Sequence, residues 1–405
     1  MQLSPIVSDP VQKSYDVVII GGAMIGSSVA WFLTANPDFD GSILVVEKDP
    51  TYEWASTTHT NSCIRQQFSN EINVRISQFG VEFIKSFRER LGGDPEVPDI
   101  LLHDYGYMYL AGDEKLAGIL RDNQKIQQAC GAATRIMTPD EIAEEYPFYN
   151  LDGIILGSHN PVDEGYFDGN TVFDWWRRKA RQNGAEYVTN EVVAITGKGN
   201  AVESVTLKSG DVISAGKVVN ASGPRANVTA RMAGLEIPVE PRRRYTFIFD
   251  AEKPLDQDLP LTIDPSGVHM RTDGQYYLCG CPPDDGDPAV EFDDFYLDHS
   301  IWEEKLWPAI ANRVPAFEAV KVTNSWVGHY AFNTLDQNAI IGAHPDVANF
   351  IFVNGFSGHG FQQSPAMGRG AGELITYGEF RELDLSPLGV ERIVRNEPFL
   401  ERAVI

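Results

Sequence analysis

The chain has 405 residues, of which 43% are hydrophobic and 22% are charged, an ordinary balance for a folded globular protein. This length is enough for two domains around a large buried core. Lysine and arginine number 33 against 57 aspartates and glutamates, which gives a formal net charge of −24. A surface this acidic repels phosphate backbones and anionic lipid headgroups, so nucleic acid and membrane surfaces are poor candidates for partners, and we expect neither nucleic-acid binding nor a membrane span.

Neither a targeting signal nor a metal site is visible in the sequence. Residues 1–14 lack the apolar core of a secretory signal and the arginine-rich pattern of a mitochondrial one. No apolar run approaches the ~20 residues that a membrane span requires. The four cysteines are too few and too irregularly spaced for a disulfide framework or a zinc site: Cys63, Cys130, Cys279 and Cys281. We therefore expect a cytoplasmic protein with reduced thiols and no bound metal.

A dinucleotide-binding pattern stands near the start of the chain. Residues 15–20 form a short, almost continuous apolar run, as in a strand buried on both faces of a parallel sheet. A glycine-rich turn over 21–26 follows, then a helical stretch over 27–34, a second apolar strand over 42–46, and Glu47. This order of strand, glycine turn, helix, strand and acidic residue predicts a βαβ unit that binds a dinucleotide.

Each part of that pattern has a physical role. The glycines let the backbone approach a pyrophosphate, which then lies at the positive N-terminal end of the helix. Glu47 is placed where a carboxylate accepts hydrogen bonds from ribose hydroxyls. Ala23 stands where the fingerprint has its middle glycine, and we expect its methyl group to push the pyrophosphate slightly outward.

The rest of the chain mixes helical and strand-like segments. Helices are expected over 72–91, 113–130 and 168–183 and from 138 onward, and strands over 101–110, 184–188, 192–195, 202–207, 217–219 and 349–354. Residues 240–333 alternate β-rich stretches with Pro/Gly/Asp turns. This mixture predicts an α/β (α+β) fold with two discontinuous domains. A Rossmann-type FAD-binding domain would comprise 1–90, 160–236 and 334–405, and a β-rich substrate domain with an antiparallel sheet 91–159 and 237–333.

Two turns later in the chain bear on whether the bound dinucleotide is NAD or FAD. Residues 218–224 (VVNASGP) are a strand that enters a turn of small residues, and the strand over 349–354 enters the turn 355–361 (GFSGHGF), followed by a helix from Ser364 to Tyr377. These segments resemble the D-amino-acid-oxidase/sarcosine-oxidase superfamily of FAD enzymes, whose GFSGHG turn is matched residue for residue. The further segments that carry the resemblance are 55–57, 65–69 and 333–338.

Within this superfamily the chain is most similar to the FAD-dependent oxidoreductase domain proteins related to the mitochondrial complex I assembly oxidoreductase. It is also similar to the sarcosine- and dimethylglycine-oxidising enzymes. The motifs extend from residue 15 to residue 375, so the resemblance covers nearly the whole chain.

The resemblance implies a bound FAD. The family places the 355–361 turn at the flavin ring, with a helix N-terminus directed at the pyrimidine oxygen that gains negative charge on reduction. Monomeric sarcosine oxidases attach their flavin through a cysteine two residues before a tyrosine. Here Gly328 stands two residues before Tyr330, so we expect non-covalent FAD. The residues expected to bind it are Gly21, Gly22, Ala23, Met24, Ile25, Gly26, Glu47, Lys48, Ser56, Thr57, Ser62, Val193, Ala221, Ser222, Gly223, Gly355, Phe356, Ser357, Gly358, His359, Gly360, Phe361 and Gln362.

The resemblance also implies candidate residues for the reacting substrate. Arg65 matches the arginine that grips the substrate carboxylate, a role that suits a guanidinium because the pair can be bidentate. Arg271, on an expected strand, is a second candidate cation. Tyr330 and His359 are expected to face the flavin, with His359 equally open to a flavin contact or a catalytic base. Gln362 replaces a lysine that helps to hold the carboxylate in sarcosine enzymes, so that recognition is altered or shared.

The expected reaction is oxidation of the C–N bond of an amino acid or N-substituted amino acid. Hydride transfer to flavin N5 would give an imine that water hydrolyses. The acceptor stays open between O₂ and an electron carrier, because residues 275–280 lack the lysine that promotes oxygen reduction in sarcosine-type oxidases. Two alternatives are a low-turnover FAD-bearing assembly or scaffold protein and a flavoenzyme that oxidises a 2-hydroxy acid. The basic run Arg242, Arg243 and Arg244 is expected to make salt bridges.

Overall fold

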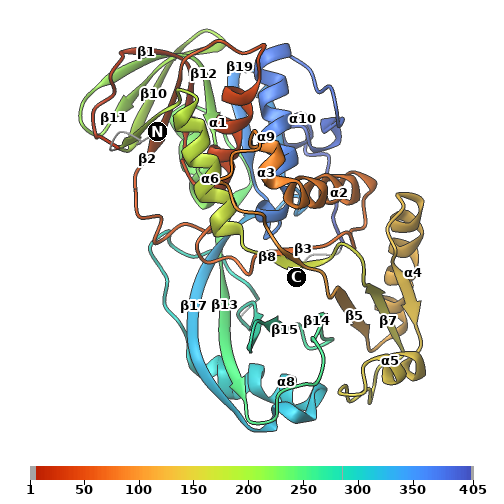
Figure 1. Ribbon diagram of the computed structural model, residues 1–405. Coiled ribbons are helices and arrows are strands. Elements are labelled where there is room, and N and C mark those ends of the chain that lie inside the picture. Colours follow the sequence, from red (N-terminus) through yellow and green to blue (C-terminus); the bar gives the residue numbers. More distant parts are fainter. Residues whose placement is uncertain (1–5, 285, 403–405) are drawn as a thin grey trace.

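The computed structural model describes residues 6–284 and 286–402. Figure 1 shows an elongated molecule in which one sheet with its helices lies above a second, more open sheet. The two sheets contain both parallel and antiparallel strand pairs. The expected mixed α/β fold class is therefore confirmed.

The upper sheet is built around the βαβ unit. Its strand order is β10-β11-β12-β1-β2-β9, and β19 pairs with both β12 and β18. β1 is parallel to β2 and β12, β2 is parallel to β9, and β12 is parallel to β19, so these strands end at the same edge. The bounds are β1 (Ser14–Ile20), β2 (Ile43–Glu47), β9 (Glu186–Thr189), β10 (Val192–Lys198), β11 (Ala201–Leu207), β12 (Val212–Asn220), β18 (Ile340–His344) and β19 (Val347–Asn354).

The apolar run of β1 is continuous because both faces of the upper sheet are covered. Val17 and Ile19 belong to a core shared with helices α1 (Met24–Ala35), α2 (Glu71–Lys85), α6 (Gly169–Gln182) and α9 (Gly360–Tyr377). Val18 and Ile20 point the other way, into a core shared with α7 (Ala226–Met232) and the β10–β11 pair. Alternation along a strand sends neighbouring side chains to opposite faces, so a strand covered on both sides must be apolar throughout.

The lower sheet comes from residues 107–160 and 239–333. Its order is β17-β13-β16-β15-β14-β5-β7-β6, antiparallel except for the β14–β5 pair. The bounds are β5 (Tyr107–Ala111), β6 (Arg135–Met137), β7 (Leu156–Asn160), β13 (Val239–Ala251), β14 (Leu261–Ile263), β15 (His269–Asp273), β16 (Tyr276–Cys281) and β17 (Val320–Asn333). Helices α4 (Glu114–Ala129), α5 (Pro139–Glu145) and α8 (Trp307–Arg313) lie along this lower part (Figure 1).

A small third sheet corrects one expected strand. The sequence predicts a single strand over 101–110, but the chain bends at 104–106, where Gly106 has φ +87°. β4 (Leu102–His103) joins β3 (Cys63–Ile64) and β8 (Gly165–Phe167), whereas β5 joins the lower sheet. Two short strands in different sheets read as one apolar run, because periodicity does not show a bend between them.

Capping residues in the sequence predict the starts of helices α5 and α6. α5 begins with a capping box in which Thr138 and Glu141 bond each other's backbone, and α6 begins at the N-cap Asp168. The expected helix over 72–91 is interrupted instead: α2 ends at Lys85, and a short α3 (Phe87–Arg90) follows. Its apolar stripe still packs inward, since Phe83 and Phe87 are buried.

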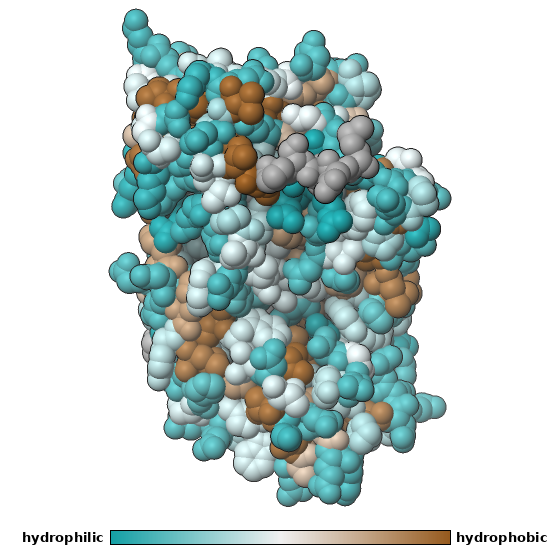
Figure 2. All heavy atoms as spheres, turned by 60° about the vertical axis from the view of Figure 1, so that its left-hand side comes forward, coloured by the Kyte–Doolittle hydropathy of each residue, from teal (hydrophilic) through white to brown (hydrophobic). Residues whose placement is uncertain are grey.

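The surface carries no sign of a membrane-crossing helix in the described part of the chain. No helix within residues 6–284 and 286–402 is both long and apolar enough to span a bilayer. On the face shown in Figure 2, hydrophilic residues predominate and hydrophobic ones form small, separate groups.

Candidate active site

A cavity of about 350 Å³ runs from the glycine turn of the upper sheet to the facing side of the lower one. Its wall includes residues from β2, the segment 52–61, the turn after β12, strands β13 and β17, and the turn before α9. The carboxyl ends of β1, β2 and β12 open onto it, which is where ligands bind in open parallel sheets. This cavity is therefore the candidate active site.

The glycine turn forms a cradle that admits no side chain. Gly21 has φ +97°, and a Cβ atom there would lie 2.5 Å from the carbonyl oxygen of Ala221. A Cβ at Gly26 would lie 1.8 Å from the carbonyl oxygen of Gly21. α1 begins at Met24 with no side-chain cap on Ala23 and no acidic residue in its first turn. Its first amides are therefore suited to a pyrophosphate.

Glu47 lies beside that cradle at the end of β2. Its carboxylate accepts hydrogen bonds from the backbone amides of Gly22 at 2.8 Å and Asp49 at 2.9 Å. Burial raises the pKa of Glu47, although the two amide hydrogen bonds act in the opposite direction. The carboxylate thus braces the glycine turn and also lines the cavity, where ribose hydroxyls would reach it.

The turn after β12 closes the other side of the cradle. Asn220 is fully buried, and its Oδ1 accepts from the backbone amide of Ser222 at 3.2 Å and from its hydroxyl at 2.7 Å. This internal bonding shapes the small-residue turn predicted from the sequence, and Ala221, Ser222 and Gly223 all line the cavity.

The GFSGHG turn brings the C-terminal part of the chain to the same cavity. Gly355, Ser357 and Gly358 all have positive φ values, of +67°, +49° and +93°. A Cβ at Gly358 would lie 2.4 Å from the ring of Tyr330, so glycine there lets the tyrosine pack across the turn. Phe356 through Gln362 line the cavity.

α9 begins earlier than its sequence suggests. The sequence predicts a helix from about Ser364 to Tyr377. The helix begins at Gly360, and Pro365 lies inside it. Pro365 has no N–H group to donate to the carbonyl oxygen of Phe361, four residues earlier. The Ser364 hydroxyl donates to that oxygen instead, at 2.7 Å.

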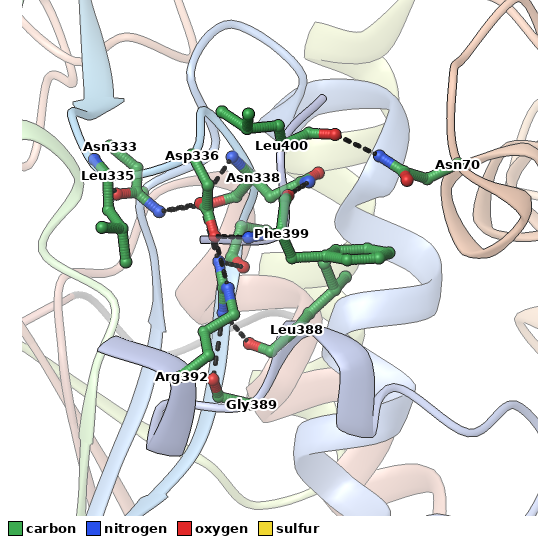
Figure 3. Close-up of polar contacts among 12 residues, drawn as sticks. Asn70, Asn333, Leu335, Asp336, Asn338, Leu388, Gly389, Arg392, Phe399 and Leu400 are labelled. Atoms are coloured by element: carbon green, nitrogen blue, oxygen red, sulfur yellow. Dashed lines mark hydrogen bonds and ion pairs between the residues drawn. The ribbon is translucent and has the colours of Figure 1, made fainter. Parts of the chain in front are cut away.

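A buried ion pair between Arg392 and Asp336 is linked to the GFSGHG turn, and Figure 3 shows the polar contacts of the pair. Arg392, in α10 (Glu391–Val394), donates to Asp336 at 2.6 Å, and the two residues are 8% and 0% exposed. Asp336 also accepts from the Asn333 side chain at 2.8 Å and from the Phe399 backbone amide at 3.0 Å. The backbone amide of Asn333 in turn donates to the Ser357 hydroxyl at 2.9 Å. The C-terminal segment is thus fastened to the GFSGHG turn.

Arg65 lies at the end of β3 and is almost completely buried, at 1% exposure. Its guanidinium lies over the Phe68 ring at 4.0 Å, donates to the Gln67 carbonyl oxygen and lies 2.8 Å from Nε2 of His359. Its backbone amide donates to the side-chain oxygen of Gln362 at 2.9 Å. The structure therefore brings Arg65 together with His359 and Gln362, which lie 294 and 297 positions later in the sequence.

His359 is held in its neutral form. Burial, followed by the charge of Arg65, lowers its pKa well below the usual value. A neutral imidazole accepts through one nitrogen, and here Nε2 accepts from the Arg65 guanidinium. That lone pair is engaged in this arrangement, which favours a positioning role over that of a catalytic base.

Tyr330 and Gly328 form the opposite wall on β17. The Arg244 guanidinium lies 4.5 Å from the centre of the Tyr330 ring, and burial raises the pKa of the tyrosine. A Cβ at Gly328 would lie 2.9 Å from the Cβ of His59. A cysteine could therefore not take this position without moving the histidine.

Arg271 does not line this cavity. It donates to Asp273 and to the backbone oxygens of Thr272 and Asn61, and it lies in a neighbouring groove. His269, two residues earlier on the same face of β15, does line the cavity. Two residues of a strand span about 6.6 Å, which is enough to move a side chain out of a site.

Other expected cofactor residues also lie outside the cavity wall. Val193 points to solvent at 45% exposure, whereas Val192 lines the cavity, so alternation along β10 selects the neighbouring residue. Ser62 lies in the same groove as Arg271. Gly22, Gly26 and Gly355 belong to the two turns but are not at the wall, whereas the remaining expected residues are.

Several residues of the cavity wall were not predicted from the sequence, among them Asn61, Thr246 and His269. The Thr246 hydroxyl donates to Asn61 Oδ1 at 3.2 Å, and Asn61 Nδ2 lies 3.1 Å from His269 Nε2. Burial, then the charges of Arg271 and Arg244, lowers the pKa of His269 to about 4. One signal in the sequence could have pointed to Thr246. It lies two residues after Arg244 and therefore on the same face of strand β13.

The predicted role of the basic run is confirmed. Arg242 pairs with Glu240 at 2.6 Å, Arg243 with Asp294 at 3.5 Å, and Arg244 with Asp287 at 2.6 Å. Besides pairing with Asp287, Arg244 also lines the cavity.

The cavity fits an FAD by its own chemistry. The side-chain-free cradle and the start of α1 suit a pyrophosphate, Glu47 suits a ribose, and the turn before α9 lies at the cavity wall, where it would hold a flavin ring.

Comparison with known proteins agrees with this geometry. The family model described as "DAO: FAD dependent oxidoreductase" matches residues 16–374. FAD-dependent oxidoreductase domain-containing protein 1 of Xenopus laevis is 37% identical over 425 residues, covering 96% of this chain and 85% of that protein. The beta subunit of sarcosine oxidase from Arthrobacter sp. is 24% identical, covering 94% and 91%.

Among solved structures, L-proline dehydrogenase from P. horikoshii is similar over 98% of this chain and 100% of its own, with a TM-score of 0.82 and 27% identity. The resemblance predicted from the motifs is thus confirmed. The chain belongs to the DAO family and is an FAD-dependent oxidoreductase.

Proposed function

We propose that this enzyme oxidises the C–N bond of an amino acid or N-substituted amino acid. The observation that carries the proposal is the buried guanidinium of Arg65, placed at the cavity wall beside the GFSGHG turn. A carboxylate is a stronger partner for a guanidinium than a neutral imidazole is, because both partners then carry charge. A substrate carboxylate at Arg65 would direct its amine along the cavity toward the flavin.

The residues of the chain would act by binding and orientation. Bound FAD supplies a two-electron acceptor that takes hydride from the carbon bearing the amine. Arg65 would hold the carboxylate, and the neutral His359 would keep the guanidinium in place without adding a second positive charge. Tyr330 would close the opposite side of the substrate space. The imine product would then be hydrolysed by water to a carbonyl compound and an amine.

The cofactor would be held without a covalent bond by the cavity-lining residues of the two turns and by Glu47. Residues 1–90, 160–236 and 334–405 would form the FAD-binding domain, and 91–159 and 237–333 the substrate domain. The support for this division is that each large sheet draws its strands from one of these sets, apart from Asn160, the last residue of β7.

The relatives favour an amino acid over a 2-hydroxy acid as substrate. They include an L-proline dehydrogenase and the beta subunit of a sarcosine oxidase, and proline and sarcosine are both secondary amino acids. The electron acceptor in this proposal is either O₂ or an electron carrier.

The test is anaerobic mixing of the purified holoenzyme with a panel of compounds. The panel contains L-proline, sarcosine, glycine, other N-methyl amino acids and matched 2-hydroxy acids. Loss of the ~450 nm flavin band with amino acids is the expected result, since only bound and reducible flavin can bleach. Bleaching by hydroxy acids alone, or by nothing in the panel, would refute the proposal.

Variants of Arg65 sharpen this test. Arg65→Ala should weaken substrate binding by roughly 2–5 kcal/mol, because it removes one partner of a desolvated charge pair. Arg65→Lys should recover only part of the loss, since an ammonium lacks the two-pronged geometry. Flavin content, measured on the same preparations, should stay near that of the wild type. Near-normal reduction of the flavin-replete Ala variant by a carboxylate substrate would exclude the clamp.

A further inference from the structure

Glu164 is a fully buried acid that the proposed reaction does not use. It lies between β7 and β8 at 0% exposure. Its Oε1 accepts from the backbone amide of Gln66 at 2.6 Å and from the Asn160 side chain at 2.9 Å. Its Oε2 accepts from the side-chain amide of Gln67 at 3.0 Å. All three hydrogen-bond partners are neutral donors.

Gln67 connects this acid to Arg65. The Gln67 carbonyl oxygen accepts a hydrogen bond from the Arg65 guanidinium. Its side-chain oxygen accepts from the Ser158 hydroxyl at 2.8 Å, and its side-chain nitrogen also donates to the Tyr107 carbonyl at 3.1 Å. With one acceptor and two donors engaged, the Gln67 side chain has a single orientation. The segment 65–67 is thus fixed to strands β5 and β7 of the lower sheet.

Three N–H donors point at the two oxygens of Glu164, and these hydrogen bonds favour the ionised carboxylate. Burial nevertheless raises the pKa of Glu164 to about 7, because desolvation outweighs the hydrogen bonds and the smaller effect of the Arg65 charge. The three donors and the Arg65 charge are the features of the site that oppose this desolvation.

We propose that Glu164 is the positioning residue for the substrate-carboxylate anchor, holding Arg65 at the cavity wall through Gln66 and Gln67. This inference rests on the proposed function, in which Arg65 binds the carboxylate. Glu164 does not touch the substrate. Glu164 orders residues 66 and 67, and the carbonyl oxygen of Gln67 in turn orients the Arg65 guanidinium. The negative charge of Glu164 also offsets the desolvation of the buried arginine.

The sharpest variant is Glu164→Gln, which keeps the volume. A carboxamide has one accepting oxygen, so its NH₂ group would face one of the three donors and leave that donor without a partner. The guanidinium then loses one of the two supports that orient it, while the contact with His359 and the FAD cradle are untouched. The probe is pyrrole-2-carboxylate, a carboxylate that cannot be oxidised, and its binding is followed by the flavin difference spectrum of the holoenzyme.

We expect the Kd for this probe to rise by about tenfold or more, the scale of one lost charged hydrogen bond. Flavin content and the limiting rate of flavin reduction at saturating substrate should stay near wild type, so the effect falls on KM and not on kcat. Glu164→Asp keeps the charge but is one methylene shorter, and should show an intermediate Kd. It also serves as the test if the Gln variant fails to fold.

The matched control is Asp264→Asn. Asp264 is buried at 7% exposure and pairs with Arg313 at 2.7 Å in the lower part of the molecule, away from the cavity wall. Its loss should lower the thermal midpoint without changing the Kd of the probe.

The possible outcomes separate the two proposals. If the wild type binds the probe and folded Glu164 variants bind it equally well, the role of Glu164 is refuted and the carboxylate site stands. If the Kd rises equally in Asp264→Asn, the effect is general destabilisation, and the role of Glu164 is again refuted. If the wild type does not bind the probe and no amino acid bleaches the flavin, the proposed function itself fails.

Discussion

The Glu47→Gln variant tests the FAD cradle most directly. In the structure the Glu47 carboxylate accepts two backbone amides, from Gly22 and Asp49 at 2.8 and 2.9 Å, and it lines the cavity. Glutamine keeps the shape but has one accepting oxygen, so its NH₂ group would face an amide donor or a ribose hydroxyl. Loss of one charged hydrogen bond should weaken FAD binding by about 1–2 kcal/mol, or roughly 5- to 30-fold in Kd.

The assay is titration of the apoprotein with FAD, followed by quenching of the flavin fluorescence. Thermal midpoints of the apoprotein are measured in parallel. Without FAD, Glu47 makes its hydrogen bond to the Gly22 amide but no ribose contact, so a lower midpoint reports loss of the Gly22 hydrogen bond alone. Glu186→Gln is the control: Glu186 belongs to β9 of the same sheet and accepts from the Val11 amide at 2.7 Å, but it does not line the cavity. A Kd for Glu47→Gln within twofold of wild type would refute the assigned role of the carboxylate.

Three further predictions concern the rest of the molecule. Acid precipitation should release all FAD into the supernatant, because Gly328 offers no side chain for attachment; yellow colour left in the pellet would show a covalent bond to another residue. Arg392→Met should lower the free energy of unfolding by about 3–5 kcal/mol, since it leaves Asp336 buried without its cation; an unchanged urea midpoint would contradict this. His269 has a folded pKa of about 4, below the usual 6.5, so acidification protonates the unfolded state first and stability falls between pH 6.5 and 4. The stability advantage of wild type over His269→Gln should therefore shrink by about 1.4 kcal/mol per pH unit below 6.5, whereas a constant difference would mean that this histidine is charged when folded.

The candidate site depends on contacts between distant parts of the chain. Arg65 is held by residues of α9 on one side and by a network that reaches β5 and β7 on the other. The turn before α9 is in turn supported by Asp336 and the C-terminal segment. Substitutions far from the cavity should therefore change substrate binding where they loosen one of these supports.

The sequence by itself was sufficient for features that depend on neighbouring residues. The β1–turn–α1–β2 unit was predicted because its glycines, its apolar strands and Glu47 lie within one stretch of about 33 residues. The starts of α5 and α6 were predicted because Thr138 and Asp168 cap their own helices. Family and cofactor followed from short motifs of the same local kind.

Only the tertiary structure decided which side chains reach the cavity. Val192 and not Val193 lines it, and Arg244 lines it where Arg271 does not. Strand periodicity shows that alternate residues share a face, but the pairing of strands decides what that face meets. Glu164 carries no sequence signal at all, because its importance comes from burial and from three donors, of which two lie on residues 66 and 67, almost 100 positions earlier in the chain. Desolvation and long-range hydrogen bonding are properties of the packed chain, and they give these residues their roles.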